Sequence, residues 1–246
     1  MIDLHCHILP GVDDGSPDME TSLLMARMAV ESGVTAIAAT PHANLPYTED
    51  EERNFASQYL HDRVRAFRRA LQENNIPLKI YTGSEVLCTP EVPELFETGN
   101  LFTINHSDYL LTEFFFDEPL EFIDDMLHAI MDAGARPILA HPERYESVQE
   151  LPMAVDRWFR EGVIIQVNKG SILGRFGEMP EQTALRILDA GQAHIVASDA
   201  HNYESRTPHM AEVADFLKEH FDPYYADILL NRNPARIVDN LDPVDV

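Results

Sequence analysis

Two histidines that lie one residue apart follow the first apolar run of the chain. The run Ile2–His5 predicts a short β-strand, and His5 and His7 then point to the same side, because strand side chains alternate between faces. Asp13 and Asp14 come a few residues later. Imidazole nitrogens and carboxylate oxygens are typical ligands of divalent ions, so this stretch is a candidate metal site. Asp13 has an alternative, because it can cap the following helix or point into water.

Further potential ligands come at the ends of the other apolar runs. Seven runs predict strands: Ile2–His5, Thr35–Thr40, Leu78–Gly83, Tyr109–Thr112, Pro137–Ala140, Val163–Val167 and His194–Ala197. The carboxyl ends of parallel strands share one face of a barrel, so the side chains that follow these runs should converge there. The nine candidate metal ligands are His5, His7, Asp14, His42, Glu85, Glu113, His141, Asp199 and His201.

The number and kind of these candidates indicate more than one ion. Nine ligands are about twice what one four- or five-coordinate ion needs. A carboxylate such as Glu85 can bridge two ions about 3.5–4 Å apart, the spacing used for in-line displacement at phosphorus. Imidazole and carboxylate without thiolate favour manganese, iron or zinc over calcium or magnesium, and the residues alone do not decide among the three.

Two arginines follow closely on the candidate ligands. Arg144 comes shortly after His141, and Arg206 shortly after His201. A guanidinium presents a planar fork that matches two phosphate oxygens. Divalent ions, an activated water and two such forks together predict hydrolysis of a phosphoester.

The elements that must position these residues alternate regularly along the chain. Four predicted helices end in glycine, the usual helix stop, and a strand follows at once; these glycines are Gly33, Gly134, Gly162 and Gly191. The alternation predicts a parallel α/β sheet closed into a barrel, as one domain over 1–246, with helix 50–74 and the tail 221–246 outside. An open doubly wound sheet is the weaker alternative, because no glycine-rich phosphate loop follows the first strand.

Composition limits the partners and the compartment. The net charge of −24 disfavours binding to nucleic acid or to an anionic membrane surface. Cys6 and Cys88 cannot form a disulfide framework, and neither an apolar run of about 18 residues nor a signal peptide is present. We therefore expect a cytoplasmic protein without membrane insertion. The sequence does not fix its oligomeric state.

Several motifs, read in order, resemble those of a known family. They are Met-Ile-Asp-Leu-His-Cys-His, Val-Asp-Asp-Gly, Thr-Pro-His, Gly-Ser-Glu-Val, Ala-His-Pro-Glu-Arg-Tyr, Gln-Val-Asn and Ala-Ser-Asp-Ala-His-Asn followed by Arg-x-Pro-His-Met. From residue 1 to about 238 the chain is similar to the PHP (polymerase and histidinol phosphatase) superfamily. Within it, the chain resembles the bacterial manganese-dependent protein-tyrosine phosphatases of capsule and exopolysaccharide operons.

The resemblance implies a fold, a reaction and a partner. It implies a distorted seven-stranded (β/α)7 barrel of the PHP type that holds three divalent ions, with manganese ahead of iron or zinc. It implies that a metal-bridging hydroxide attacks phosphotyrosine. The implied substrate is the phosphotyrosine tail of a bacterial tyrosine autokinase that regulates polysaccharide synthesis.

The resemblance also implies a role for each site residue. It places His5, His7, Glu85 and Asp199 on one ion, Glu85, Glu113 and His141 on a second, and Asp14, His42 and His201 on the third. Arg144 and Arg206 would bind the phosphate, and with Asp199 and His201 they form the expected catalytic set. The stretch 43–52 does not match the family pattern, and we expect it to shape substrate entry.

Other interpretations remain open from the sequence. A small-molecule phosphatase, for example one acting on histidinol phosphate, a nucleotide phosphoesterase, and a metal-binding regulator without turnover are the alternatives. Cys6 and Cys88 do not fit the Cys-x5-Arg loop of cysteine phosphatases and are expected to be buried thiols. Histidines 61, 128, 194, 209 and 220 are expected to be structural. The arginines at 63, 65, 68 and 69 form a solvated face or a dock for an acidic segment.

Overall fold

The computed structural model describes residues 1–46 and 55–244, and a strand overlaps each of the seven predicted runs. The strands are β1 (Ile2–Cys6), β2 (Ala36–Ala39), β3 (His42–Ala43), β4 (Lys79–Thr82), β5 (Glu85–Leu87), β6 (Tyr109–Glu113), β7 (Arg136–Ala140), β8 (Ile164–Asn168) and β9 (Ile195–Ala197). All of their pairings are parallel, in the orders β1-β2-β4 and β3-β5-β6-β7-β8-β9. The prediction of a parallel α/β fold is therefore confirmed.

Two short strands, β3 and β5, directly follow two of the predicted runs, so the described residues form nine strands in two sheets, where the sequence predicted seven strands in one barrel. β3 continues the line of β2 after Pro41, and β5 continues that of β4 after Gly83. The segments at Gly83 and Thr40 are too close for a side chain on Gly83, since a Cβ there would lie 2.9 Å from the Thr40 side chain. The sequence pattern did not show these breaks.

Backbone hydrogen bonds between the first and last strands join the two sheets into a distorted barrel. The amide of Asp199 donates to the carbonyl of His5 (2.9 Å), and the amide of His7 donates to the carbonyl of Ala200 (2.8 Å). Cys6 and Ala200 form a parallel bridge. This seam brings the beginning and the end of the chain to the same place.

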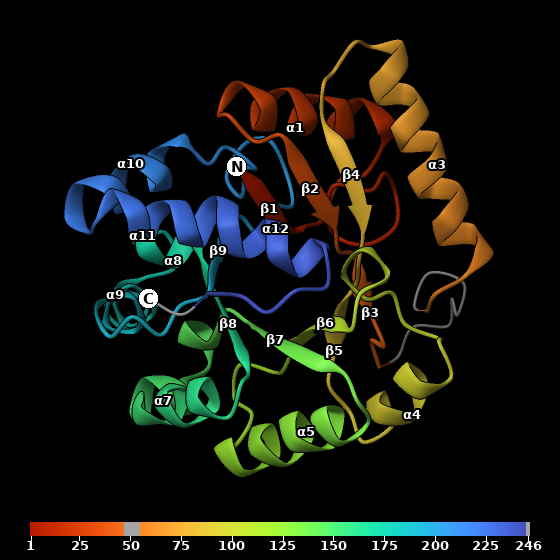
Figure 1. Cartoon of the computed structure of the whole chain (residues 1–246). Coiled ribbons are helices and arrows are strands. Elements are labelled where there is room, and N and C mark those ends of the chain that lie inside the picture. The colour runs from red at the N-terminus through yellow and green to blue at the C-terminus, as the bar shows by residue number, and fades with distance from the viewer. Residues whose placement is uncertain (47–54, 245–246) are drawn as a thin grey trace.

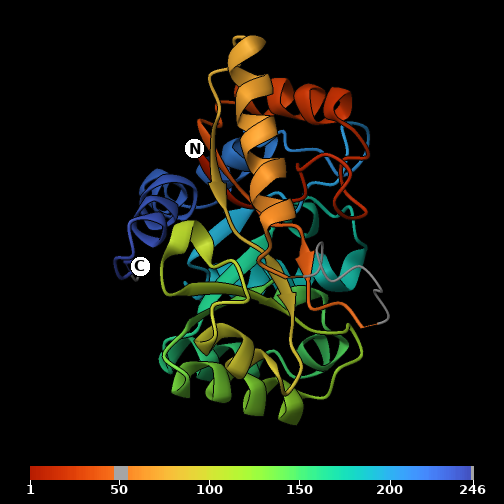
Figure 2. The ribbon, with the colours of Figure 1, turned by 90° about the vertical axis from the view of Figure 1, so that its right-hand side faces the viewer.

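Helices surround the strands (Figures 1 and 2). They are α1 (Met19–Glu31), α3 (Gln58–Glu73), α4 (Val92–Glu97), α5 (Leu120–Asp132), α6 (Glu146–Glu150), α7 (Met153–Arg160), α8 (Lys169–Ile172), α9 (Glu178–Asp189), α10 (Ala211–His220), α11 (Pro223–Asp227) and α12 (Asn233–Val238), with short 3-10 or π turns at Ile104–His106, Pro142–Arg144 and Ile228–Arg232. The four glycines predicted to stop helices all have positive φ. The helix expected over 50–74 begins only at Gln58 in the described chain, where Ser57 caps it.

The barrel interior shows that the C-terminal tail is only partly outside, so that prediction was wrong. Inward-facing side chains of the strands, including Leu4, Leu111 and Ile138, form one apolar cluster. Ile237 and Val238 of α12 belong to the same cluster and are buried. α12, which lies in front of the strands in Figure 1, therefore covers one end of the barrel core. The sequence predicted that this segment lies outside the barrel, because it is too short to show a helical period.

Candidate metal centre

All nine candidate ligands lie at one end of the barrel. His5 and Glu113 come from β1 and β6, and His42 and Glu85 begin β3 and β5. The other five follow strand ends or lie in loops: His7, Asp14, His141, Asp199 and His201. Together they form three overlapping groups whose ligand atoms lie within 4.8 Å of one another, apart from His141, which joins them through Glu85.

The innermost group is fully buried. Nε2 of His5 lies 3.1 Å from Oε1 of Glu85, and Nε2 of His7 lies 3.0 Å from Oε2 of the same carboxylate. Both Nε2 atoms lie 3.5–3.7 Å from Oδ1 of Asp199. These four residues are the set that the resemblance places on the first ion.

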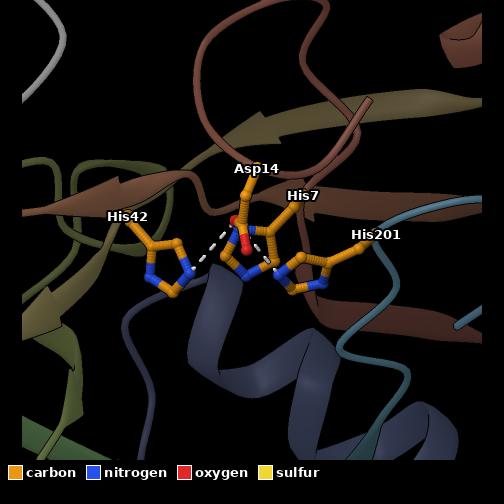
Figure 3. Close-up of side chains that lie close together, drawn as sticks. All are labelled: His7, Asp14, His42 and His201. Carbon is orange, nitrogen blue, oxygen red and sulfur yellow. Dashed lines mark ion pairs between the residues drawn. The ribbon is translucent and has the colours of Figure 1, made fainter. Parts of the chain in front are cut away.

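The outer group lies at the mouth of the centre (Figure 3). The carboxylate of Asp14 points between two imidazoles, with Oδ1 3.4 Å from Nε2 of both His42 and His201. His7 lies behind them and completes the group. The Asp14 side chain is 68% exposed, so this group is open to solvent on one side.

The third group surrounds the other side of Glu85. Nδ1 of His42 lies 2.8 Å from Oε1 of Glu113 and 3.2 Å from Oε2 of Glu85. Nε2 of His141 lies 3.0 Å from Oε1 of Glu85. The resemblance assigns His141 and Glu113 to one ion, whereas the structure groups Glu113 with His42. In both arrangements Glu85 is the shared carboxylate.

Hydrogen bonds outside the centre turn two imidazoles toward a cation. Nδ1 of His5 contacts Oε1 of Gln166 at 2.9 Å, and Nδ1 of His7 contacts Oδ2 of Asp13 at 2.7 Å. An Nδ1–H that donates to each oxygen leaves the Nε2 lone pairs facing inward. Those two Nε2 atoms are only 3.3 Å apart, and a cation that binds both lone pairs relieves their repulsion. The donor set therefore fits divalent metal ions.

The electrostatics of the centre favour positive charge. Burial opposes protonation of His7, but the charge of Asp13 outweighs it and raises the His7 pKa to about 9. Burial is likewise outweighed at His42, where Glu85, Asp14 and Glu113 raise the pKa to about 12. Burial would raise the pKa of Asp199, but the nearby His5 charge lowers it to about 2. Without metal, protons on imidazole supply the positive charge that these carboxylates require.

Two residues of the centre have strained backbones. His141 and Asp199 have φ values of 36° and 49°, a left-handed conformation that few residues other than glycine adopt, although Asn, Asp and His adopt it more often than most. Strain of this kind persists where surrounding contacts impose it, often at functional sites. At both positions it turns the side chain at the strand end into the centre.

Both predicted phosphate-binding arginines reach the centre. Nη2 of Arg206 lies 2.6 Å from Oδ1 of Asp199, and Nη1 of Arg144 lies 3.3 Å from Oδ2 of Asp199. The Arg144 guanidinium lies between two aromatic rings, 4.4 Å from Phe116 and 4.5 Å from Phe176. A pocket of about 210 Å³ opens here, lined by Asp14, His42, Glu85, Glu113, Phe116, His141, Arg144, Asp199, His201 and Arg206.

Sequence reasoning did not assign an orienting role to the residues that hold these groups in place. Asp13, whose role was open, holds His7, and Gln166 holds His5. The side-chain amide Nδ2 of Asn168 donates to Oδ2 of Asp199 at 2.7 Å. Gln166 and Asn168 lie within the motif Gln-Val-Asn, so a polar residue inside an apolar strand was the available signal. Nothing in the local sequence marked Phe176.

The residues expected to be structural lie outside the three groups. His61 packs on Phe102, and His194 stacks on Phe159. Cys6 and Cys88 are free and buried, and burial raises the pKa of both thiols, so neither is a poised nucleophile. Most of the α3 arginines have intramolecular partners: Arg63 lies over Tyr59, Arg65 pairs with Asp62, and Arg68 donates to the carbonyl of Ile80.

Residues 1–239 match the protein family described as capsular polysaccharide synthesis, CpsB/CapC. The chain is 35% identical to the tyrosine-protein phosphatase YwqE of Bacillus subtilis over 224 residues, which cover 90% of this chain and 85% of YwqE. It is 30% identical to the tyrosine-protein phosphatase CpsB of Streptococcus pneumoniae over 243 residues, which cover 97% of this chain and 98% of that protein.

Solved structures show the same similarity. One from a study of YwqE and CpsB, described as metal-dependent tyrosine phosphatases, has a TM-score of 0.90 at 32% identity and covers 100% of this chain and 99% of its own. A phosphotriesterase from Mycobacterium tuberculosis has a TM-score of 0.61 at 11% identity, covers 97% of this chain and 94% of its own, and is similar in fold alone.

Proposed function

The chain belongs to the capsular polysaccharide synthesis CpsB/CapC family, and on that premise we propose that it is a metal-dependent protein-tyrosine phosphatase. The observation that carries the proposal is the convergence of four imidazoles on the carboxylate of Glu85, beside two arginines. Such a donor set binds divalent ions, and the arginines are placed for a phosphate bound at them.

We propose that the centre holds three divalent ions, manganese ahead of iron or zinc. The three overlapping groups support this number, and the preponderance of imidazole and carboxylate supports this choice of metal. When bound, these ions would supply Lewis-acid activation of the water that attacks phosphorus.

The chain's own residues would position the phosphate and its leaving group. Arg144 and Arg206 both contact Asp199, so a phosphate next to Asp199 is within reach of both guanidiniums. Asn168 and the two arginines fix the orientation of the Asp199 carboxylate. In the hydrolysis, a water oxygen forms a bond to phosphorus as the bond to the tyrosine oxygen breaks. A phenol has a pKa of about 10, so the leaving oxygen can depart with little help from a general acid.

We propose a phosphotyrosine segment of a bacterial tyrosine kinase as the substrate. The family's role in capsular polysaccharide synthesis and the naming of its relatives as tyrosine phosphatases support a protein substrate. None of the helices in residues 1–46 and 55–244 is long and apolar enough to cross a bilayer. The two free thiols support our prediction of a cytoplasmic location.

Activity and metal content test the proposal together. Purified protein should hydrolyse a phosphotyrosine peptide, lose that activity on thorough chelation, and regain it on addition of manganese. Phosphoserine peptide and histidinol phosphate should be poorer substrates. Elemental analysis should find close to three ions per chain. Activity that persists after complete metal removal, or preference for histidinol phosphate, would contradict the proposal.

A further inference from the structure

A second pocket lies directly beside the metal centre. Its volume is about 410 Å³, within the range of roughly 300–1,000 Å³ typical of small-molecule sites. Its lining residues are His42, Leu45, Pro46, Leu87, Glu113, Phe114, Phe115 and Phe116. His42 and Glu113 are also candidate metal ligands, and Phe116 lines both pockets. A molecule held at the metal centre can therefore extend into this second pocket.

The walls of the second pocket are mainly apolar, in contrast to those of the metal centre. Apart from His42 and Glu113 at the shared boundary, every lining residue is Leu, Pro or Phe. Phe115 and Phe116 are 52% and 44% exposed, although large apolar side chains are usually buried. Exposed aromatic side chains at the edge of a polar site are typical of contacts with a ligand.

Phe116 links this pocket to the phosphate-binding arginine. The Arg144 guanidinium lies 4.4 Å from the centre of the Phe116 ring. A phosphate bound by Arg144 thus has an apolar wall next to it, on which the ester group of a phosphate monoester can lie. An aromatic ester group matches this wall in shape and polarity, whereas a short alkyl group such as that of phosphoserine leaves most of the pocket empty.

We propose that this pocket, which we call the aryl pocket, binds the aromatic ring of phosphotyrosine while the phosphate is at the metal centre. The inference rests on the proposed function and deepens it, because it assigns the preference for aryl over alkyl phosphates to Phe115, Phe116 and Leu87. Phe115 lines the aryl pocket but not the pocket at the metal centre, unlike Phe116, which makes it the residue to change.

The test compares Phe115→Ala with wild-type protein loaded with manganese. We expect the KM for phosphotyrosine to rise about threefold to tenfold, the effect of losing one aromatic contact, while kcat stays within about twofold. The KM for phosphoserine and the inhibition constant of inorganic phosphate should not change. Phe115→Leu should restore part of the loss. Leu151→Ala, which removes a comparably exposed side chain elsewhere (54%), is the matched control and should behave as wild type.

A binding measurement gives a readout that does not depend on turnover. Calorimetry should show that phenylphosphonate binds more tightly than methylphosphonate to the wild type, and that Phe115→Ala removes most of this difference. An unchanged difference would overturn the proposal. So would equal losses for phosphotyrosine, phosphoserine and inorganic phosphate, which would show that Phe115 only supports the metal centre.

Two further outcomes distinguish the aryl pocket from a pocket for an adjacent peptide residue, and distinguish it from the proposed function. If Phe115→Ala weakens only longer phosphotyrosine peptides and not phosphotyrosine itself, the pocket holds an adjacent residue and the aryl assignment is wrong. If the wild type hydrolyses no phosphomonoester but still prefers phenylphosphonate, the proposed function fails while the aryl pocket stands.

Discussion

Glu85 contacts more of the other candidate ligands than any other carboxylate of the centre does. Oε1 faces His5 and His141, and Oε2 faces His7 and His42. Burial alone would raise the pKa of this carboxyl, but the charges of His5 and His42 hold it well below its ordinary value. The side chain therefore stays ionised, as a carboxylate that bridges ions must be.

At the scale of single residues, Asp13 is the clearest positioning residue. It accepts hydrogen bonds from His7, from the amide of His42 at 3.1 Å and from the amide of Gly15 at 3.0 Å. Asp13→Asn should lower metal affinity about 10- to 100-fold, since partners of metal-binding histidines commonly contribute that much. Elemental analysis after dialysis against graded chelator measures the effect. Asp62→Asn on the exposed face of α3 is the control, and unchanged metal retention in Asp13→Asn would refute the role.

Lys169 gives a pH-dependent prediction. It is buried, and its Nζ donates to the carbonyls of Thr207 and His209. Burial lowers its pKa to about 8 from the ordinary 10.5, so between these values the unfolded chain binds more protons than the folded one. The free energy of unfolding of the wild type, relative to Lys169→Met, should therefore increase between pH 8 and 10.5 by roughly 3 kcal/mol, at about 1.36 kcal/mol per pH unit.

Urea unfolding of the two proteins across this pH range measures that difference. Comparison with Lys169→Met cancels the titration of groups common to both, including Tyr109, whose pKa is raised by burial to about 12. A difference that stays constant from pH 8 to 10.5 would show that Lys169 is charged in the folded protein throughout.

At the scale of elements, the short helix α8 packs against Phe176, and the Phe176 ring in turn packs on Arg144. A Cβ on Gly170 would lie 2.4 Å from Cε2 of Phe176, so Gly170→Ala must displace the ring that packs on Arg144. We expect a higher KM for phosphotyrosine with unchanged metal content. Phe176→Ala should have the same effect. The double variant should have a KM no higher than either single variant, because each of them removes the same contact between Phe176 and Arg144. Additive losses measured by steady-state kinetics would contradict this.

Sequence alone predicted the elements that are defined by local pattern. Continuous apolar runs marked the strands, and α5 has apolar residues at three- and four-residue spacing, of which Ile123, Met126, Leu127 and Ile130 are buried. The strand-end ligands converged because parallel strands share a face. The pairing of Arg144 with Phe176 and the break at Gly83 were not predictable, since they depend on contacts between segments distant in sequence.

Part of the sequence-based prediction concerns residues that the structure does not describe. The first residues of the helix expected over 50–74 lie outside the described residues, as does most of the 43–52 stretch expected to shape substrate entry. Within the latter, Leu45 and Pro46 line the aryl pocket. The roles of individual ligands on individual ions stay predictions.

At the scale of the whole molecule, the core of the barrel depends on the C-terminal segment. Ile237 is fully buried against the strand residues of the barrel interior. Ile237→Ala should reduce the free energy of unfolding by about 2–5 kcal/mol, as other large-to-small core changes do. Leu241→Ala, at an exposed site four residues on, should have little effect. Equal unfolding midpoints for wild type and Ile237→Ala in urea would show that α12 does not contribute to the core.

The seam between β1 and β9 has a consequence for biosynthesis. His5 and His7 leave the ribosome long before Asp199 and His201, because most of the sequence lies between them. The nascent chain therefore lacks part of the candidate ligand set until Asp199 and His201 have been made. Ions held by the full proposed set would bind only after that point and could not guide the folding of the segments made earlier.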